Sequence, residues 1–517
     1  MSDLPFGGAP AVAGTVYLVG GGPGDPGLLT LRGAQLLATA TVVAHDRLSP
    51  REALALCRRD AELIDVGKLP DRHPLPQDEI NALLVARAQA GQAVVRFKGG
   101  DPFVLARGSE EAQACRGAGV PFEVVPGITS GIAAPAYAGI PVTHRGVAPA
   151  FAVVTGHEDP TKPDTQVDYD ALARFPGTLL LYMGVGRLAE IAGALVAAGR
   201  PPTTPVALVQ WGSTSRQRTI TGTLADIAQQ REESGLANPA MIVVGDVVAL
   251  REELSWFEQR PLHGVSVLVP RTRSQASELS ERLRGLGAET LEAPTIDIEP
   301  APDPERLRAA VAALADGAYD WVVFTSTNAV AAVAEQVAAL GLDARLFAGV
   351  RIGAVGSGTA QALLALGLQA DLVPERQTGI ALGQALVAAA PDETARALLP
   401  RADIAGTALV STLAEAGWDV DDVEAYRTVP VQSLPPTVVE RLHADEIDVI
   451  AFSSSSTARN FVTLFGGPPP PATRVASIGP STSATCREHG MAVAAEADPH
   501  DVDGLVDAVV RAVSRTG

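Results

Sequence analysis

The chain has 517 residues, of which 47% are hydrophobic and 19% charged, and its formal net charge is −19. This composition indicates a globular protein with room for several domains of roughly 100–200 residues, and the negative charge argues against nucleic acid as the main partner. Three scattered cysteines, no apolar run of ~20 residues and no signal-peptide pattern predict a cytoplasmic protein without a metal site or a membrane span.

The first predicted strand, Val16–Val19, runs into the glycine-rich loop Gly20–Gly27, and a helix is expected from about Leu28. Gly22–Gly27 satisfies the pattern GxGxxG, and Asp46 lies near the spacing expected for a ribose-binding acid. A dinucleotide site in an NAD-dependent oxidoreductase is therefore one interpretation of this loop.

The chemistry of the loop favours a different ligand. A pyrophosphate needs free amides at the start of a helix, but Pro23 and Pro26 each lack one, and Asp25 adds a negative charge. A ligand with a cationic centre and no phosphate suits the loop better. S-adenosylmethionine is such a ligand.

Two further strands are predicted to end in loops of the same kind. Val94–Phe97 is a β-branched and aromatic run that stops at Gly99–Pro102, and Phe122–Val125 stops at Pro126–Ser130. Together these loops would place exposed backbone groups and the carboxylate of Asp101 at the carboxyl edge of a sheet. Open α/β sheets bind their ligands at that edge.

The first half of the chain resembles uroporphyrinogen-III C-methyltransferase, a tetrapyrrole methylase, from about residue 14 to 258. The resemblance implies two lobes, about 14–145 and 146–258, and a homodimer formed through this half. It is carried by Val19–Thr30, His45–Leu48, Val66–Lys68, Arg96–Phe103, Val125–Thr129 and Val154–His157.

This resemblance also implies site residues and the cofactor S-adenosylmethionine. Asp46 matches the proposed general base of the family and Lys68 the proposed acid, while His45 stands where the family usually has Tyr. Met183 would cover the adenine with a polarisable surface, or would alternatively be a simple core residue. The residues expected to line the cofactor pocket are Pro23, Gly99, Gly100, Asp101, Val104, Thr129, Ser130, Met183 and Gly212.

Lysine usage gives an independent reason to single out Lys68. The only lysines are Lys68, Lys98 and Lys162, in a chain that otherwise uses arginine for its cations. Arginine does not release a proton in proteins, whereas a desolvated lysine does. A lysine in this background indicates a titrating role.

The second half begins again with a strand at Val265–Val269 and continues as a flavodoxin-like α/β series with hydroxyl-rich loops at the strand ends. It resembles uroporphyrinogen-III synthase over about 264–517. The family fold implies one lobe of about 264–300 plus 430–517 and a middle lobe of about 303–425. The motifs are Val269–Arg271, Tyr319–Val330, Ala354–Gly356, Leu372–Glu375, Leu399–Arg401, Tyr426–Val429 and Ile478–Thr482.

In this half the resemblance implies that Tyr426 is the acid and that the substrate is bound by Arg271, Ser326, Ser454 and Ser481. The whole chain would then close hydroxymethylbilane to uroporphyrinogen III with inversion of ring D. It would also methylate C2 and C7 of that product to precorrin-2, toward sirohaem or cobalamin. The alternative is another precorrin methyltransferase fused to a tetrapyrrole-sensing, non-catalytic module.

Overall fold

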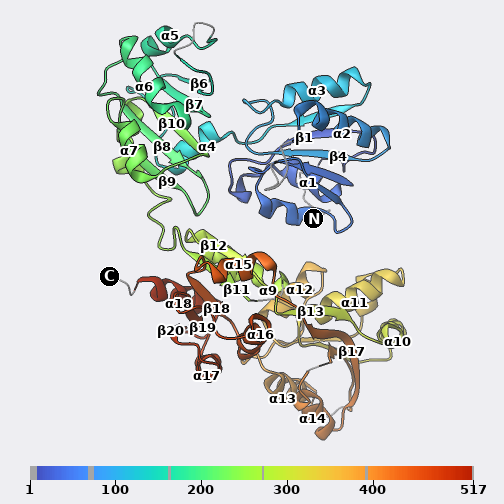
Figure 1. Ribbon diagram of the computed structural model, residues 1–517. Helices are drawn as coiled ribbons and strands as arrows, with labels where there is room; N and C mark the ends of the chain where they lie inside the picture. Colours follow the sequence, from blue (N-terminus) through green and yellow to red (C-terminus); the bar gives the residue numbers. More distant parts are fainter. Residues whose placement is uncertain are drawn as a thin grey trace. The chain divides into compact units, whose positions relative to one another are not determined.

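The described residues form four five-stranded sheets with helices packed against them, so the chain has the mixed α/β fold that the sequence predicts (Figure 1). The computed structural model describes residues 8–67, 75–160, 165–270, 273–390, 394–403 and 405–514, without the side chains of 273–277. The chain divides into two compact units. One comprises residues 1–267, 280–290 and 513–517, and the other comprises residues 268–279 and 291–512. The predicted domain boundaries at 258 and 264 remain predictions.

The first sheet is entirely parallel, with the order β3-β2-β4-β1-β5. The carboxyl ends of its strands therefore meet at one edge, where the glycine-rich loops begin. In sheet order the strands are β3 (Glu62–Asp65), β2 (Val42–His45), β4 (Val94–Lys98), β1 (Val16–Gly20) and β5 (Phe122–Val125).

Helices cover both faces of this sheet, and its central strands β2, β4 and β1 are buried along their whole length. Along β4, Val95 and Phe97 pack toward α1 and η2, while Val94 belongs to the core on the side of α2 and α3. The helices are η1 (Pro26–Leu28), α1 (Leu31–Thr39), η2 (Arg51–Leu56), α2 (Gln77–Gln89) and α3 (Gly108–Gly117).

The second sheet is mixed, with the order β6-β7-β10-β8-β9; β6 and β7 pair in parallel, and the other neighbouring strands pair antiparallel. Its strands are β6 (Phe151–Thr155), β7 (Thr178–Tyr182), β10 (Ala240–Val244), β8 (Pro205–Gln210) and β9 (Arg218–Thr223). Its helices are α4 (Ser130–Tyr137), α5 (Tyr169–Arg174), η3 (Val185–Arg187), α6 (Leu188–Ala197), α7 (Ile227–Ser234), η4 (Asp246–Leu250) and α8 (Arg251–Leu254).

Helix α4 lies within the range 14–145 expected for the first lobe, yet it packs on the second sheet (Figure 1). Ala134, Ala138 and Ile140 are buried there against strands β7, β8 and β10. The small residues of α4 allow this close approach, so the chain passes from one lobe to the other before the helix begins.

The second half contains two more sheets. One has the order β12-β11-β18-β19-β20: β12 (Glu289–Glu292), β11 (Ser266–Val269), β18 (Val449–Phe452), β19 (Arg474–Ser477) and β20 (Val493–Glu496). Its helices are α9 (Arg273–Gly285), α15 (Pro436–His443), α16 (Ser455–Phe465), α17 (Pro480–Glu488) and α18 (Val502–Ser514).

The other sheet has the order β13-β17-β16-β14-β15: β13 (Ile296–Pro300), β17 (Asp419–Pro430), β16 (Arg396–Ala402), β14 (Trp321–Phe324) and β15 (Arg351–Ala354). Its helices are α10 (Pro304–Ala315), α11 (Thr327–Ala339), η5 (Ala344–Phe347), α12 (Ser357–Ala365), α13 (Gly379–Ala389) and α14 (Ala408–Glu415). Strand β13, within the range 264–300 expected for the first lobe, pairs antiparallel with residues 426–430 of β17, just beyond the range 303–425 expected for the middle lobe.

Candidate functional sites

Three glycines bring the loops after β1, β4 and β5 into backbone contact. A Cβ atom on Gly127 would lie 2.2 Å from the carbonyl oxygen of Gly100, and one on Gly20 would lie 2.5 Å from the amide nitrogen of Gly127. Gly100 has a φ of +69°, which also favours glycine. We call this meeting of Gly20, Gly100 and Gly127 the glycine junction; no side chain larger than hydrogen fits at Gly20 or Gly127.

The glycine-rich loop has its amides engaged within the protein. Gly22 donates to the Gly100 carbonyl at 3.2 Å, and Gly100 donates back to the Gly22 carbonyl at 2.6 Å. Because Pro23 and Pro26 have no amide hydrogen, the loop offers little to a pyrophosphate. The other loop amides that donate to protein oxygen atoms are those of Gly21, Asp25, Gly27 and Leu28.

Asp101 ties the β4 loop to the β5 loop. Its Oδ1 accepts from the Phe103 amide at 2.8 Å, and its Oδ2 accepts from the Gly127 amide at 3.1 Å. A carboxylate has further lone pairs, so these contacts leave room for a ligand donor. Asp101 thus shapes the glycine junction in addition to any ligand contact. Val104 follows it on the same loop.

A tyrosine of the second sheet reaches the loop after β5. The Tyr182 hydroxyl lies 2.6 Å from Thr129 Oγ1 and accepts from the Gly131 amide at 2.6 Å. Ser130, between them, is the first residue of α4. Met183 follows Tyr182 with a φ of +58° and is 50% exposed, so it is not a core residue.

Asp25 makes a second link between the lobes. Its Oδ2 accepts from the Tyr137 hydroxyl at 2.7 Å, and its amide donates to Ser213 Oγ at 3.2 Å. Burial, and then this hydrogen bond, raise the pKa of the Tyr137 phenol above its usual range. Next to Ser213, a Cβ on Gly212 would lie 2.4 Å from the Cβ of Ala134, so Gly212 is required for packing against α4.

Strained backbone concentrates in the same loops. Six non-glycine residues in the described part of the chain have a positive φ, and five of them follow β4, β7 or β8. Such conformations cost of order 1–3 kcal/mol each and cluster at functional sites. The five are Leu105, Arg107, Met183, Trp211 and Ser213.

Asp46 follows β2 and is held by a buried group of charges that the sequence analysis did not identify. Arg96 Nη2 donates to its Oδ1 at 2.6 Å, and Lys98 Nζ lies 4.0 Å from its Oδ2. Glu111 accepts from both cations. Burial, and then the Arg96 guanidinium, lower the pKa of the Lys98 ammonium. The sequence does contain a signal for this group: Arg96 and Lys98 occupy alternating positions of β4, whose other residues are apolar. Lys68 lies outside the described residues.

In the second half, the structure brings Tyr426 and Ser326 together. Their hydroxyl oxygens are 2.9 Å apart, although the residues are 100 positions apart in the sequence. Ser326 caps α11 by accepting from the Ala329 amide at 3.1 Å, and Tyr426 on β17 is only 8% exposed. The hydroxyl pair therefore has a fixed geometry.

The other predicted residues of this half form a separate hydroxyl cluster. Ser454 caps α16 by accepting from the Thr457 amide at 3.3 Å, and the neighbouring Ser455 has its Oγ 3.1 Å from Ser481 Oγ. No contact between this cluster and Tyr426 is seen among the described residues. Arg271 lies outside them.

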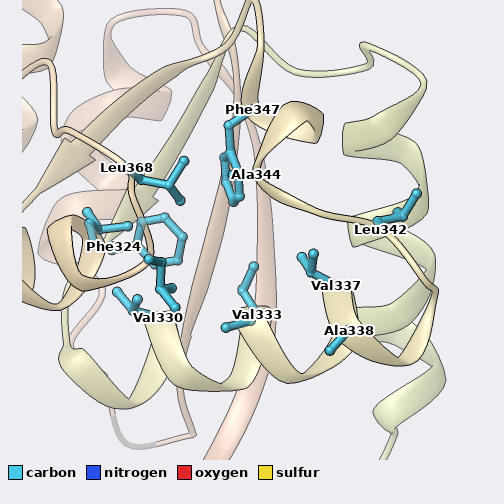
Figure 2. A pocket seen from close by; sticks show the side chains of 12 residues that line it. Phe324, Val330, Val333, Val337, Ala338, Leu342, Ala344, Phe347 and Leu368 are labelled. Atoms are coloured by element: carbon cyan, nitrogen blue, oxygen red, sulfur yellow. The ribbon is translucent and has the colours of Figure 1, made fainter. Parts of the chain in front are cut away.

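An apolar cavity of about 150 Å³ is lined by residues of α11, η5 and α12. Figure 2 shows Val333 and Val337 of α11 on one side of it and Phe347 of η5 on the other. Every side chain that lines it is Ala, Val, Leu or Phe, so it supplies no acid, base or hydrogen-bond donor. The lining residues are Phe324, Val330, Val333, Ala334, Val337, Ala338, Leu342, Ala344, Phe347, Leu363, Leu366 and Leu368.

Within the part of the chain that the structure describes, no three His, Cys, Asp or Glu side chains come together in a way that could hold a metal ion. Nor does that part contain a helix with the length and apolar character needed to cross a membrane.

Comparison with known proteins gives matches to both halves. The family model of tetrapyrrole (corrin/porphyrin) methylases matches residues 15–228, and that of uroporphyrinogen-III synthase HemD matches residues 277–507. A porphyrin biosynthesis protein HemD from Ruminiclostridium josui is 36% identical over 96% of this chain and 97% of its own length.

Relatives of the first half alone are also found. A uroporphyrinogen-III C-methyltransferase from Priestia megaterium is 50% identical over 46% of this chain and 98% of its own length. A solved uroporphyrin-III C-methyl transferase from Thermus thermophilus, complexed with S-adenyl homocysteine, is 42% identical with a TM-score of 0.40, over 46% of this chain and 99% of that one. With the first half matching one family and the second half the other, the chain belongs to the tetrapyrrole methylases and to the uroporphyrinogen-III synthases, fused in one polypeptide.

Proposed function

We propose that the first half transfers methyl groups from S-adenosylmethionine to C2 and C7 of uroporphyrinogen III, giving precorrin-2. The second half would produce that substrate by closing hydroxymethylbilane with inversion of ring D. The product of the second half is then the substrate of the first, which gives the fusion a chemical reason. Precorrin-2 would continue toward sirohaem or cobalamin.

The observation that carries the methyl-transfer proposal is the glycine junction. Its loops have the close backbone approach of a ligand-binding edge, yet the amides of Gly22 and Gly100 each donate to the carbonyl oxygen of the other residue. This arrangement suits a cofactor without a pyrophosphate and disfavours the NAD alternative. Relatives of this half are named as methyltransferases, which agrees with S-adenosylmethionine as the cofactor.

Several residues of the chain would hold this cofactor. The loops of Pro23, Gly99 and Gly100 would admit it to the backbone, and Asp101 would accept from its hydroxyl or ammonium groups while keeping the β4 and β5 loops together. Val104, Thr129 and Ser130 would line the pocket. Met183, half exposed beside Tyr182, and the loop of Gly212 would close it from the second lobe. When bound, S-adenosylmethionine supplies an electrophilic methyl group.

The acid and base of methyl transfer would be Lys68 and Asp46. Methylation of a pyrrole carbon requires the tetrapyrrole to lose a proton, and Asp46 would accept it on a carboxylate oxygen. Arg96 fixes the orientation of that carboxylate through its bond to Oδ1. Lys68 would act as the acid and polarise the π system of the tetrapyrrole while the ring carbon attacks the methyl group.

Ring closure in the second half needs less help from the protein, because the electron-rich pyrrole itself expels the hydroxyl group. Tyr426 would donate a proton to the departing hydroxyl, with its own hydroxyl oriented by Ser326 at 2.9 Å. Ser454 and Ser481 would bind substrate groups from the other lobe, as would Arg271. A homodimer through the methyltransferase half completes the proposal.

One experiment tests both halves. The full chain is incubated with hydroxymethylbilane, with and without S-adenosylmethionine, and the products are followed by mass, absorbance and isomer chromatography. We expect uroporphyrinogen III without the methyl donor and a dimethylated product with it. If the uninverted isomer is the only product formed without S-adenosylmethionine, the synthase assignment is overturned. If uroporphyrinogen III stays unmethylated when S-adenosylmethionine is present, the methyltransferase assignment is overturned.

A further inference from the structure

Three charged side chains are buried beside Asp46. Arg96 and Lys98 stand two residues apart on β4, so they point to the same face of the sheet, and α3 packs on that face and supplies Glu111. Their side chains are 2%, 4% and 0% exposed, whereas Asp46 is 31% exposed. Burial of an ion costs several kcal/mol unless it is paired, so each of these charges needs its partner.

The distances show how the partners are shared. Glu111 Oε1 accepts from Arg96 Nε at 2.9 Å and from Lys98 Nζ at 3.0 Å. Asp46 Oδ1 accepts from Arg96 Nη2 at 2.6 Å. Lys98 Nζ is 4.0 Å from Asp46 Oδ2, beyond hydrogen-bonding distance. Lys98 therefore lies between two carboxylates and is bonded to the buried one.

We propose that Glu111 is a positioning residue for methyl transfer, because it holds the Lys98 ammonium away from Asp46 and so leaves Oδ2 open to accept a proton. The inference rests on the proposed function, which takes Asp46 as the base. The new bond to the methyl carbon would use an electron pair of the tetrapyrrole ring. The sulfur of S-adenosylmethionine would keep the electron pair of the carbon–sulfur bond that breaks. The ring cation then loses a proton to Oδ2, and the bonding pair of that proton stays in the tetrapyrrole.

The charge of Glu111 is the feature that matters in this proposal. Glu111→Gln keeps the oxygen that accepts from Arg96 Nε and Lys98 Nζ but removes its negative charge, so the Lys98 ammonium is held far less strongly. The nearest carboxylate to the freed ammonium is then Asp46, and a bond to Oδ2 would block the base. A purely structural role for Glu111 makes a different prediction, since removal of a second buried charged group would then not restore activity.

The test therefore uses a rescue. Single-turnover methylation of uroporphyrinogen III is measured for the full chain and for Glu111→Gln, which we expect to slow it roughly tenfold or more, short of the ~10²–10⁴-fold effect of losing a general base. The double variant Glu111→Gln/Lys98→Met should recover most of that loss, because no ammonium remains to occupy Oδ2. A double variant as slow as the single one, or slower, would overturn the proposal.

Two controls make the result specific. Glu62→Gln removes a carboxylate that also pairs with an arginine, Arg87, at 2.7 Å in the same lobe but away from Asp46, and should leave the rate unchanged. S-adenosylhomocysteine affinity, measured by calorimetry, should be the same in all variants.

Asp46→Asn separates the inference from the function on which it rests. Full activity of Asp46→Asn would show that Asp46 is not the base. If Asp46→Asn is inactive but Lys98→Met does not restore the activity of Glu111→Gln, only the proposed role of Glu111 is overturned. If Glu111→Gln alone does not fold, the double variant is compared directly with the parent chain. A rate within about threefold of the parent then supports the proposal, and a loss as large as that of Asp46→Asn overturns it.

Discussion

The hydroxyl of Tyr182 lies 2.6 Å from Thr129 Oγ1, so a side chain of the second sheet is bonded to the loop that leaves the first sheet. The same hydroxyl accepts from the Gly131 amide at 2.6 Å. The loop after β5 is thus positioned by Tyr182, a residue of the opposite lobe. Met183 directly follows Tyr182 in the chain and so lies close to this loop.

Tyr182→Phe removes both hydrogen bonds and keeps the ring. Each hydrogen bond contributes about 0.5–1.5 kcal/mol net, so the loss of both corresponds to about 1–3 kcal/mol, and we expect S-adenosylhomocysteine to bind roughly 5- to 160-fold more weakly because the Thr129 loop is less ordered. Calorimetry measures this. Tyr169→Phe is the matched control, since the Tyr169 hydroxyl has no hydrogen-bond partner among the described residues. Equal affinities for the two variants would contradict the prediction.

Gly127→Ala tests the glycine junction. The added methyl group would lie 2.2 Å from a backbone oxygen of Gly100, which the two loops relieve only by separating. Overpacking typically destabilises by roughly 1–3 kcal/mol, and we expect binding of S-adenosylhomocysteine to be lost as the loops shift. Thermal unfolding and calorimetry check both effects.

The control for that substitution is Gly193→Ala, in the interior of α6. A Cβ at Gly193 has no neighbour within 4 Å, so the change should stabilise the protein by up to about 1 kcal/mol through helix propensity. If both alanines had the same effect on binding, the close approach at Gly127 would not be what shapes the pocket.

Lys68→Arg should impair methylation and leave cofactor affinity nearly unchanged. The substitution keeps the positive charge but removes an amine that titrates. Single-turnover rates with saturating S-adenosylmethionine report the chemical step. Lys162→Arg makes the same exchange elsewhere in the chain and should have no effect. Full activity of Lys68→Arg would leave Lys68 as a cation that binds substrate carboxylates.

Tyr426→Phe should slow closure of hydroxymethylbilane while preserving the isomer that forms. Loss of a general acid typically slows a reaction ~10²–10⁴-fold, and we expect the low end or below because the pyrrole already expels the leaving group. The two isomers are separated chromatographically at high enzyme concentration, since spontaneous closure gives the uninverted ring.

Tyr319→Phe provides the comparison for Tyr426. Tyr319 is also buried in the middle lobe, but its hydroxyl donates to Asp421 at 2.5 Å and not to a predicted site residue. Its loss should lower stability without slowing closure. Rapid turnover of Tyr426→Phe to mainly the uninverted isomer would make Tyr426 a determinant of substrate folding instead of an acid.

The sequence alone determined the strands and the chemistry at their ends. Val94–Phe97 and Phe122–Val125 were predicted as strands cut off by glycine and proline, and the structure places both as parallel strands beside β1. The prolines at 23 and 26 likewise disfavour a phosphate-binding loop, because they lack the amide hydrogens that it needs. These are local properties, because backbone conformation and missing amides depend on residue type and immediate neighbours.

Only the tertiary structure decided which distant side chains meet. Glu111 resembles any other helical glutamate in the sequence, and it becomes a partner of Arg96 and Lys98 only because α3 packs on that face of β4. Tyr182 reaches Thr129 across 53 residues for the same kind of reason. Strand β13 pairs with β17 over more than a hundred residues. Such pairings are fixed by the burial of whole faces of helices and sheets, which no local pattern of residues specifies.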